Sequence, residues 1–187
     1  MACSTIIDSQ MSLEAALAGS LAPPQILDQM CLIEVAYTAF DGRQHQGQLV
    51  IHRRLKEEVQ AVFWLIEDIG FPVARVLPIV AYGWSDDVSM ADNNTSAFNY
   101  RYVSGTERLS LHADGCAVDI NPTNNPVFYE NGSSAPRGAL YDPDKPGTLY
   151  EGHTIVRAFL EQGWRWGGHF VHVRDYHHFE KDLQGPR

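Results

Sequence analysis

The length, composition and charge of the chain already exclude several classes of protein. The chain has 187 residues, of which 44% are hydrophobic and 20% are charged, so it can bury the core of one folded domain. Its formal net charge of −9 argues against a nucleic-acid or anionic-membrane surface, and no apolar run is long enough to span a bilayer. We therefore expect a monomeric globular protein with no nucleic-acid partner and no membrane span.

The first residues predict a short appendage. Residues 1–24 form a loosely attached lead-in that ends at Pro23-Pro24, and residues 25–187 form the domain itself. No basic leader precedes a continuous apolar core, so the segment does not have the pattern of a secretory signal. We expect that the chain stays in the cytoplasm, leaves it by a route without a cleaved signal, or has been trimmed. Three scattered cysteines, Cys3, Cys31 and Cys116, predict reduced thiols rather than a disulfide framework.

A hairpin and a helix follow the lead-in. Residues 31–52 predict two strands around an Asp41-Gly42 turn. Residues 54–70 predict the clearest helix of the chain, because their apolar side chains recur at helical spacing and because Gly70 ends the pattern. Its apolar stripe is typical of core packing.

The second half of the chain alternates short strands with loops and one helix. Residues 76–83 predict a strand that leads into a polar loop, and residues 116–120 predict the next strand. Residues 121–152 predict an irregular segment, whose length is uncommon unless it lines a functional site. Residues 153–163 predict a helix and residues 169–180 an extended segment. The order β-β-α-β-β-α-β indicates an α+β domain built on an antiparallel sheet.

The stretch SLHADGCAVDINP, residues 110–122, carries the first candidate ligands. His112 and Asp119 are the residue types that bind zinc, but a fully extended chain would hold their Cα atoms about 23 Å apart. We therefore expect the chain to fold back at Gly115. Strand alternation then places Asp119 and Cys116 on opposite faces, so Cys116 is not expected to be a ligand. By itself this pair is also typical of a hydrogen-bonded turn.

The stretch DYHHFE, residues 175–180, supplies the rest of the candidate site. His178 would complete a set of two histidines and one carboxylate, which leaves the fourth zinc position open for water, as in catalytic sites. Asp175 would be placed to take a proton from that water. In a regular strand Asp175 and His178 would point to opposite faces, so the backbone must bulge or turn at residues 176–177.

These residues form motifs that resemble a known family. S-x-H-x-x-G-x-A-x-D, followed by G-W-x-W-G-G and D-x-x-H-F-E, is similar to the zinc D-alanyl-D-alanine carboxypeptidase and L-alanyl-D-glutamate peptidase family, which trims bacterial cell-wall peptides. The motifs are filled by Ser110, His112, Gly115, Ala117, Asp119, Trp164, Trp166, Gly167, Gly168, Asp175, His178, Phe179 and Glu180. Residues 93–101, NNTSAFNYR, also look like the family's segment ahead of the first ligand, and the resemblance covers roughly residues 30–182.

The resemblance implies a fold, a cofactor and a set of roles. The fold is a small antiparallel sheet with helices packed on it and a zinc site at the sheet edge, as in hedgehog domains and D,D-peptidases. The implied site is Zn²⁺ held by His112, Asp119 and His178, with Asp175 as the catalytic general base and with Arg101 and Ser110 binding the substrate. His178 is taken as the ligand rather than His177 because it precedes Phe-Glu.

Several of these roles have simpler alternatives. Arg101 could pair with an acidic neighbour such as Asp92 instead of a substrate carboxylate. Ser110 could only cap the turn. Glu180 is expected to orient a ligand histidine.

Three functions remain open on the sequence alone. The first is a zinc peptidase that cuts peptidoglycan stem peptides, either as a D,D-carboxypeptidase or as an L-alanyl-D-glutamate endopeptidase. The segments SAFNYR and GWRWGGHF favour the endopeptidase side, where lysis enzymes (endolysins) reach the cell wall after release or by export without a signal. The second is a cytoplasmic dipeptidase for free D-alanyl-D-alanine, and the third is a non-catalytic zinc-binding module. The presence of Asp175 and Arg101 argues against the third function.

Overall fold

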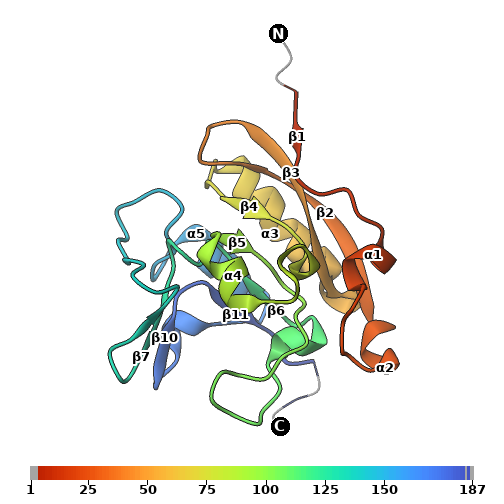
Figure 1. Cartoon of the computed structure of the whole chain (residues 1–187). Helices are drawn as coiled ribbons and strands as arrows, with labels where there is room; N and C mark the ends of the chain where they lie inside the picture. Colours follow the sequence, from red (N-terminus) through yellow and green to blue (C-terminus); the bar gives the residue numbers. More distant parts are fainter. Residues whose placement is uncertain (1–3, 184, 186–187) are drawn as a thin grey trace.

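A long hairpin lies along one side of the fold in the computed structural model, which describes residues 4–183 and 185 (Figure 1). Strand β2 (Met30–Thr38) pairs antiparallel with β3 (Gln44–His52) along its whole length, from Met30 opposite His52 to Thr38 opposite Gln44. Strand β1 (Ile6–Ile7) pairs in parallel with the other edge of β3, so the strand order is β1-β3-β2. The predicted hairpin is confirmed.

Helix α3 covers this sheet. A 3-10 turn, η1 (Arg53–Leu55), leads directly into α3 (Lys56–Asp68), which packs against β2. Four apolar side chains of α3 are fully buried, namely Val59, Val62, Phe63 and Ile66, and each contributes about 1.5–3 kcal/mol when it leaves water. The helix ends where Gly70 adopts a φ of 64°. The predicted helix is confirmed, and its stripe packs into the core.

The N-terminal residues lie against the same hairpin. Helices α1 (Leu13–Leu17) and α2 (Pro24–Leu27) follow β1, and the Ser12 side chain caps α1 by accepting a hydrogen bond from the Ala15 N–H. Ala16 and Ala22 are buried in a small apolar cluster with Met30, Val50 and Phe98. The domain boundary after residue 24 stays a prediction.

The strand predicted over residues 76–83 is wrong for most of its length. Strand β4 (Arg75–Val76) has only two residues and pairs in parallel with β5 (Asn94–Thr95), and a 3-10 helix, η2 (Ile79–Tyr82), follows. Pro78 accounts for the early end of β4, because proline has no N–H to donate to a neighbouring strand. The polar loop predicted next contains the short helix α4 (Asp86–Ala91).

The second half of the chain builds two further sheets. It contains η3 (Leu111–Asp114), β6 (Ala117–Asp119), β7 (Val127–Tyr129), β8 (Ser134–Ala135), α5 (Thr154–Glu161), β9 (Arg165–Trp166), η4 (Gly167–His169), β10 (Val173–Asp175) and β11 (His178–Glu180). Strand β11 lies between β6 and β9, whereas β10 pairs with β7. The extended segment predicted over residues 169–180 is therefore two strands in different sheets, separated by the turn expected at residues 176–177.

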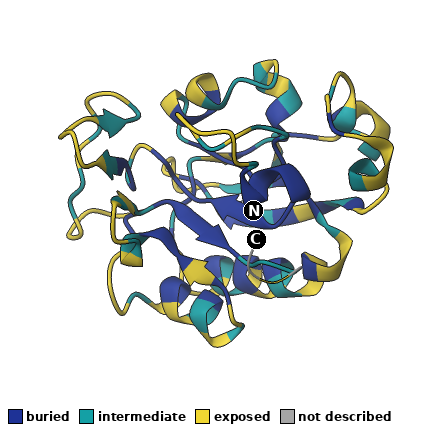
Figure 2. Cartoon of the chain, turned by 90° about the horizontal axis from the view of Figure 1, so that it is seen from below, coloured by how far each residue is buried: buried dark blue, intermediate teal, exposed yellow. Residues whose placement is uncertain are grey.

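One apolar core joins these parts. It runs from α3 and the hairpin to β6, β9, β11 and α5, and Figure 2 shows the buried segments at the centre with exposed segments around them. Phe159 of α5 stacks on Phe179 of β11 with ring centroids 4.1 Å apart. The α+β class is confirmed, but the described residues form four small sheets rather than one. The hedgehog-like arrangement stays a prediction.

Two findings bear on the expectations about thiols and membranes. Cys31 and Cys116 are free cysteines, and Cys3 lies outside the described residues. Across residues 4–183, no helix combines the length and the apolarity that crossing a membrane requires.

Gly115 provides the turn that the sequence requires between His112 and Asp119. It adopts a φ of 63°, and its carbonyl accepts a hydrogen bond from the His52 N–H at 2.9 Å. A Cβ at this position would lie 2.6 Å from Met30 Sδ and 2.7 Å from His52 N. The turn therefore has both a left-handed backbone and a close approach to the hairpin, and only glycine satisfies both.

We expect Gly115→Ala to lower the free energy of unfolding by about 2–5 kcal/mol, since it combines a left-handed alanine with overlap in the core. Urea unfolding of the purified variant measures this loss. Gly42→Ala is the matched control, because Gly42 has a φ of 76° but no atom within 4 Å of the position that a Cβ would take. The control should lose only about 1–2 kcal/mol. Equal losses in the two variants would show that the close approach has no cost.

Candidate metal centre

Three side chains from separate elements meet at one point. His112 of η3, Asp119 of β6 and His178 of β11 each offer a ligand atom, and these atoms all lie within 4.8 Å of one another. Asp119 and His178 are direct partners in the antiparallel register of β6 and β11, so their side chains share a face. The turn at Gly115 returns the chain so that His112 reaches the same face.

The distances within this cluster fit a small divalent cation. Asp119 Oδ2 lies 3.1 Å from His112 Nε2, Asp119 Oδ1 lies 2.9 Å from His178 Nδ1, and the two ring nitrogens are 3.1 Å apart. Ligand atoms at about 2.0–2.2 Å from a tetrahedral zinc are roughly 3.3–3.6 Å from one another. The ligand atoms would need to separate by about 0.2–0.7 Å to hold the ion.

The outer nitrogens of both histidines have partners that orient the rings. His112 Nδ1 donates to the Ala97 carbonyl, and His178 Nε2 lies 3.1 Å from Glu180 Oε2, to which it donates. Nε2 of His112 and Nδ1 of His178 are therefore the nitrogens that face the cluster, and each can bind a metal once it has lost its proton. Metal-binding histidines almost always have such an outer acceptor, so the residues present fit a zinc ion.

Burial and charge keep the carboxylate of the cluster ionised. His112, Asp119 and His178 are all at least nine-tenths buried. Burial opposes the charge of Asp119, but His112 and His177 outweigh it and hold the pKa of that carboxyl well below its usual range. Burial likewise lowers the pKa of His178, yet Asp119 and Glu180 outweigh it and raise this pKa to about 10. The cluster thus contains a buried anion ready to serve as a ligand.

Asp175 lies at the end of β10, on the far side of the turn from His178. Its side chain is partly exposed, and Oδ1 lies 3.0 Å from His177 Nε2. The charge of Asp175 also contributes to the raised pKa of His178, which places it within electrostatic reach of the cluster.

The two expected substrate-binding residues differ in their surroundings. Arg101 Nη2 lies 3.0 Å from Asp86 Oδ2, so its acidic neighbour is Asp86, and Asp92 instead pairs with Arg75 at 2.9 Å. Ser110 Oγ accepts a hydrogen bond from the His112 N–H at 3.3 Å and caps η3. The capping contact of Ser110 is therefore present, and its contact with substrate stays a prediction.

Sequence reasoning did not identify Tyr129 as a neighbour of the site. Burial raises the pKa of Tyr129, and the charges of Asp175 and Asp86 raise it further while Arg101 opposes them. The register of β7 and β10 places Tyr129 on the same face as the candidate base Asp175, because Tyr129 lies opposite Val173, two residues before Asp175. The only signal in the sequence was the unusual length of the irregular segment that contains it, because β7 is too short to show a periodic pattern.

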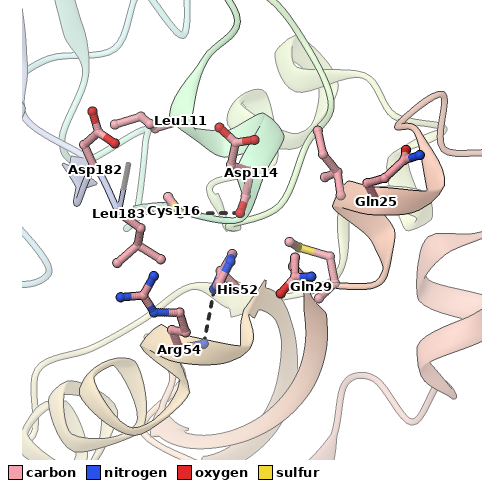
Figure 3. A pocket seen from close by; sticks show the side chains of 11 residues that line it. Gln25, Gln29, His52, Arg54, Leu111, Asp114, Cys116, Asp182 and Leu183 are labelled. Carbon is pink, nitrogen blue, oxygen red and sulfur yellow. Dashed lines mark hydrogen bonds between the residues drawn. The ribbon is translucent and has the colours of Figure 1, made fainter. Parts of the chain in front are cut away.

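A cavity of about 350 Å³ borders η3, the turn that carries His112 (Figure 3). Leu111, Asp114 and Cys116 line it from the turn, whereas none of the three cluster residues does. Cys116 thus faces away from the cluster, as strand alternation predicts, and its thiol donates to the Asp114 carbonyl at 3.4 Å. This cavity is separate from the cluster.

The comparison with known families concerns the segment that contains this cluster. Residues 104–181 match the family model of the D-alanyl-D-alanine carboxypeptidases. The resemblance is confirmed over this segment, which includes Ser110, all three cluster residues and Asp175 but leaves out Arg101. No curated protein and no solved structure matches the chain. The carboxypeptidase match supports a peptidase that acts on peptidoglycan peptides of the D-alanyl-D-alanine type.

We expect Glu180→Gln to weaken zinc binding by about 10–100-fold, because the charged acceptor behind His178 is lost. Competition with a chromophoric chelator measures the affinity. Glu151→Gln is the control, since Glu151 is an exposed carboxylate that pairs with His169, at 2.5 Å, outside the cluster. Equal zinc affinities of the Glu180→Gln and Glu151→Gln variants would contradict the role of Glu180.

Zinc should also raise the melting temperature of the unmodified chain, because the ligand set exists only in the folded state.

Proposed function

We propose that this chain is a zinc peptidase that hydrolyses peptidoglycan stem peptides, as an L-alanyl-D-glutamate endopeptidase or as a D-alanyl-D-alanine carboxypeptidase. One observation carries the proposal: a buried set of two histidines and one aspartate, with both outer ring nitrogens hydrogen bonded, lies within the segment that matches the carboxypeptidase family. The enzyme would meet its substrate at the cell wall.

The proposed chemistry assigns a role to each of these residues. His112, Asp119 and His178 hold the ion, which when bound supplies a Lewis acid that polarises the scissile carbonyl and makes a water molecule acidic near neutral pH. Asp175 accepts the proton of the attacking water at its carboxylate and returns it to the nitrogen of the leaving amine.

Arg101 is the proposed anchor for a carboxylate of the substrate. One nitrogen of its guanidinium contacts Asp86, and its buried Nε has no hydrogen-bond partner among the described residues. A guanidinium has five N–H donors, so it can serve Asp86 and a second carboxylate together. Stem peptides carry free carboxylates. Ser110 accepts from the His112 N–H, and its hydroxyl hydrogen is proposed to bind the peptide.

The roles of Asp175 and His178 predict different losses. Asp175→Asn should retain zinc and lose nearly all turnover, since an amide cannot accept the proton, whereas His178→Ala should lose zinc and turnover together. Zinc content by atomic absorption and hydrolysis of a purified stem peptide measure the two effects. An Asp175→Asn variant that retains both zinc and full turnover would exclude Asp175 as the base.

The role of Arg101 predicts an effect on substrate affinity. Arg101→Lys keeps the charge but loses the planar fork, so KM should rise about 10–100-fold while kcat changes little. Steady-state kinetics on the stem peptide measures both constants. Arg157→Lys is the control, because Arg157 is an exposed residue of α5 that pairs with Glu161. A KM as low as that of the control would refute the assignment.

Mass spectrometry of the products identifies the bond that is cut. Release of the terminal alanine from stem peptides or intact sacculi indicates the carboxypeptidase, and loss of the whole tail after L-alanine indicates the endopeptidase. Cleavage of free D-alanyl-D-alanine alone would indicate the cytoplasmic dipeptidase instead. Zinc binding without any turnover would leave a non-catalytic module and would refute the proposed function.

A further inference from the structure

His177 is a buried histidine in a turn. It lies at the junction of β10 and β11, where polar side chains usually point to water, yet only 3% of its surface is exposed. Its backbone carbonyl accepts a hydrogen bond from the Ile120 N–H at 3.0 Å, directly after the candidate ligand Asp119. A buried polar ring needs partners: one of its nitrogens has a hydrogen-bond partner, and the other lies against the carboxylate of Asp175.

One ring nitrogen is anchored on a rigid point of the fold. His177 Nδ1 lies 2.7 Å from the Asn125 carbonyl oxygen, and because a carbonyl can only accept, Nδ1 donates the hydrogen. Asn125 is itself fully buried: its side-chain amide donates to the Gly147 carbonyl at 3.0 Å and accepts from the Leu149 N–H at 2.6 Å. The ring is therefore attached to a residue that cannot easily move.

The other ring nitrogen faces Asp175. His177 Nε2 lies 3.0 Å from Asp175 Oδ1, and within the described residues this oxygen is buried without a well-aligned hydrogen bond. The contact places the ring directly beside this oxygen, so the ring restricts rotation of the carboxylate. The Asp175 backbone is also confined, because it pairs with Val127 and because a Cβ on Gly167 would come within 2.4 Å of the Asp175 carbonyl oxygen.

We propose that His177 is a positioning residue that holds the Asp175 carboxylate in the orientation needed to take a proton from the attacking water. The χ2 angle of an aspartate is broadly distributed, so a base with a free carboxylate would spend time in unproductive orientations. A displacement of about 1 Å in a catalytic group can cost about 100-fold in rate. The inference rests on the proposed function, since it requires Asp175 to be the general base.

The test compares two substitutions of His177 with a matched control. His177→Phe keeps the planar ring but removes both nitrogens, so kcat on the stem peptide should fall about 100-fold while KM and zinc content stay within about threefold. His177→Gln places an amide N–H near Asp175 and should recover about tenfold of this loss. His172→Phe is the control, because His172 is an exposed histidine of the same segment that pairs with Glu130 at 2.8 Å; its kcat should not change.

A double-mutant cycle separates positioning from a merely structural role. In the Asp175→Asn background, His177→Phe should cause no further loss of kcat, because the group on which it acts is already gone. Equal losses in both backgrounds, or loss of zinc, would overturn the inference. If the His177→Phe variant does not fold, the His177→Gln variant is the test. The inference would be overturned if this variant kept the kcat of the unmodified chain, or if it lost as much kcat in the Asp175→Asn background as in the unmodified one.

The outcomes also distinguish this inference from the proposed function. An unmodified chain that binds zinc but hydrolyses no stem peptide would overturn the proposed function and this inference with it. An active unmodified chain whose His177→Phe variant keeps full kcat would overturn this inference alone.

Discussion

The pairing of β6 with β11 is the constraint on which the site depends. It places His178 directly opposite Asp119, and a slip of one residue would turn His178 to the other face of the sheet. Phe179 prevents such a slip, because it pairs with both Val118 and Trp166 and is buried in the core. The apolar core therefore determines the geometry of the polar cluster: Phe179 fixes the register of β11, and the register fixes the position of the candidate ligand His178.

The sequence predicted those parts of the structure whose pattern is local. Helices α3 and α5 show periodic apolar positions, the hairpin shows apolar runs on both sides of an Asp41-Gly42 turn, and the fold-back at Gly115 followed from the length of chain between two candidate ligands. The strand predicted over residues 76–83 was wrong for most of its length, and the helix α4 was not predicted, because the structure of both segments depends on tertiary contacts. Strand β4 pairs with β5, and Asn94 lies 19 residues after its partner Arg75. No pattern within either strand reveals that partner. Two-residue strands are too short for alternation to show.

The same difference between local patterns and distant partners applies to the candidate site. His112, Asp119 and His178 lie in motifs that the sequence displays, whereas the partner of Arg101 comes from elsewhere in the fold. Asp86, which contacts Arg101, belongs to a helix that the sequence did not predict. The charge of Asp86 partly neutralises the guanidinium. The contact with Asp86 also orients the arginine, so less side-chain entropy would be lost when a substrate carboxylate binds.

The side chains around the cluster form a series of anchored groups. The ring of His112 is held by the Ala97 carbonyl, and the ring of His178 by Glu180. His177 is held in the same way by a backbone carbonyl, and it contacts the candidate base rather than the cluster. Buried polar groups destabilise a fold unless each has a partner, so each of these anchors stabilises the chain as well as the site. The same hydrogen bonds that make burial tolerable also orient the groups that the proposed reaction needs.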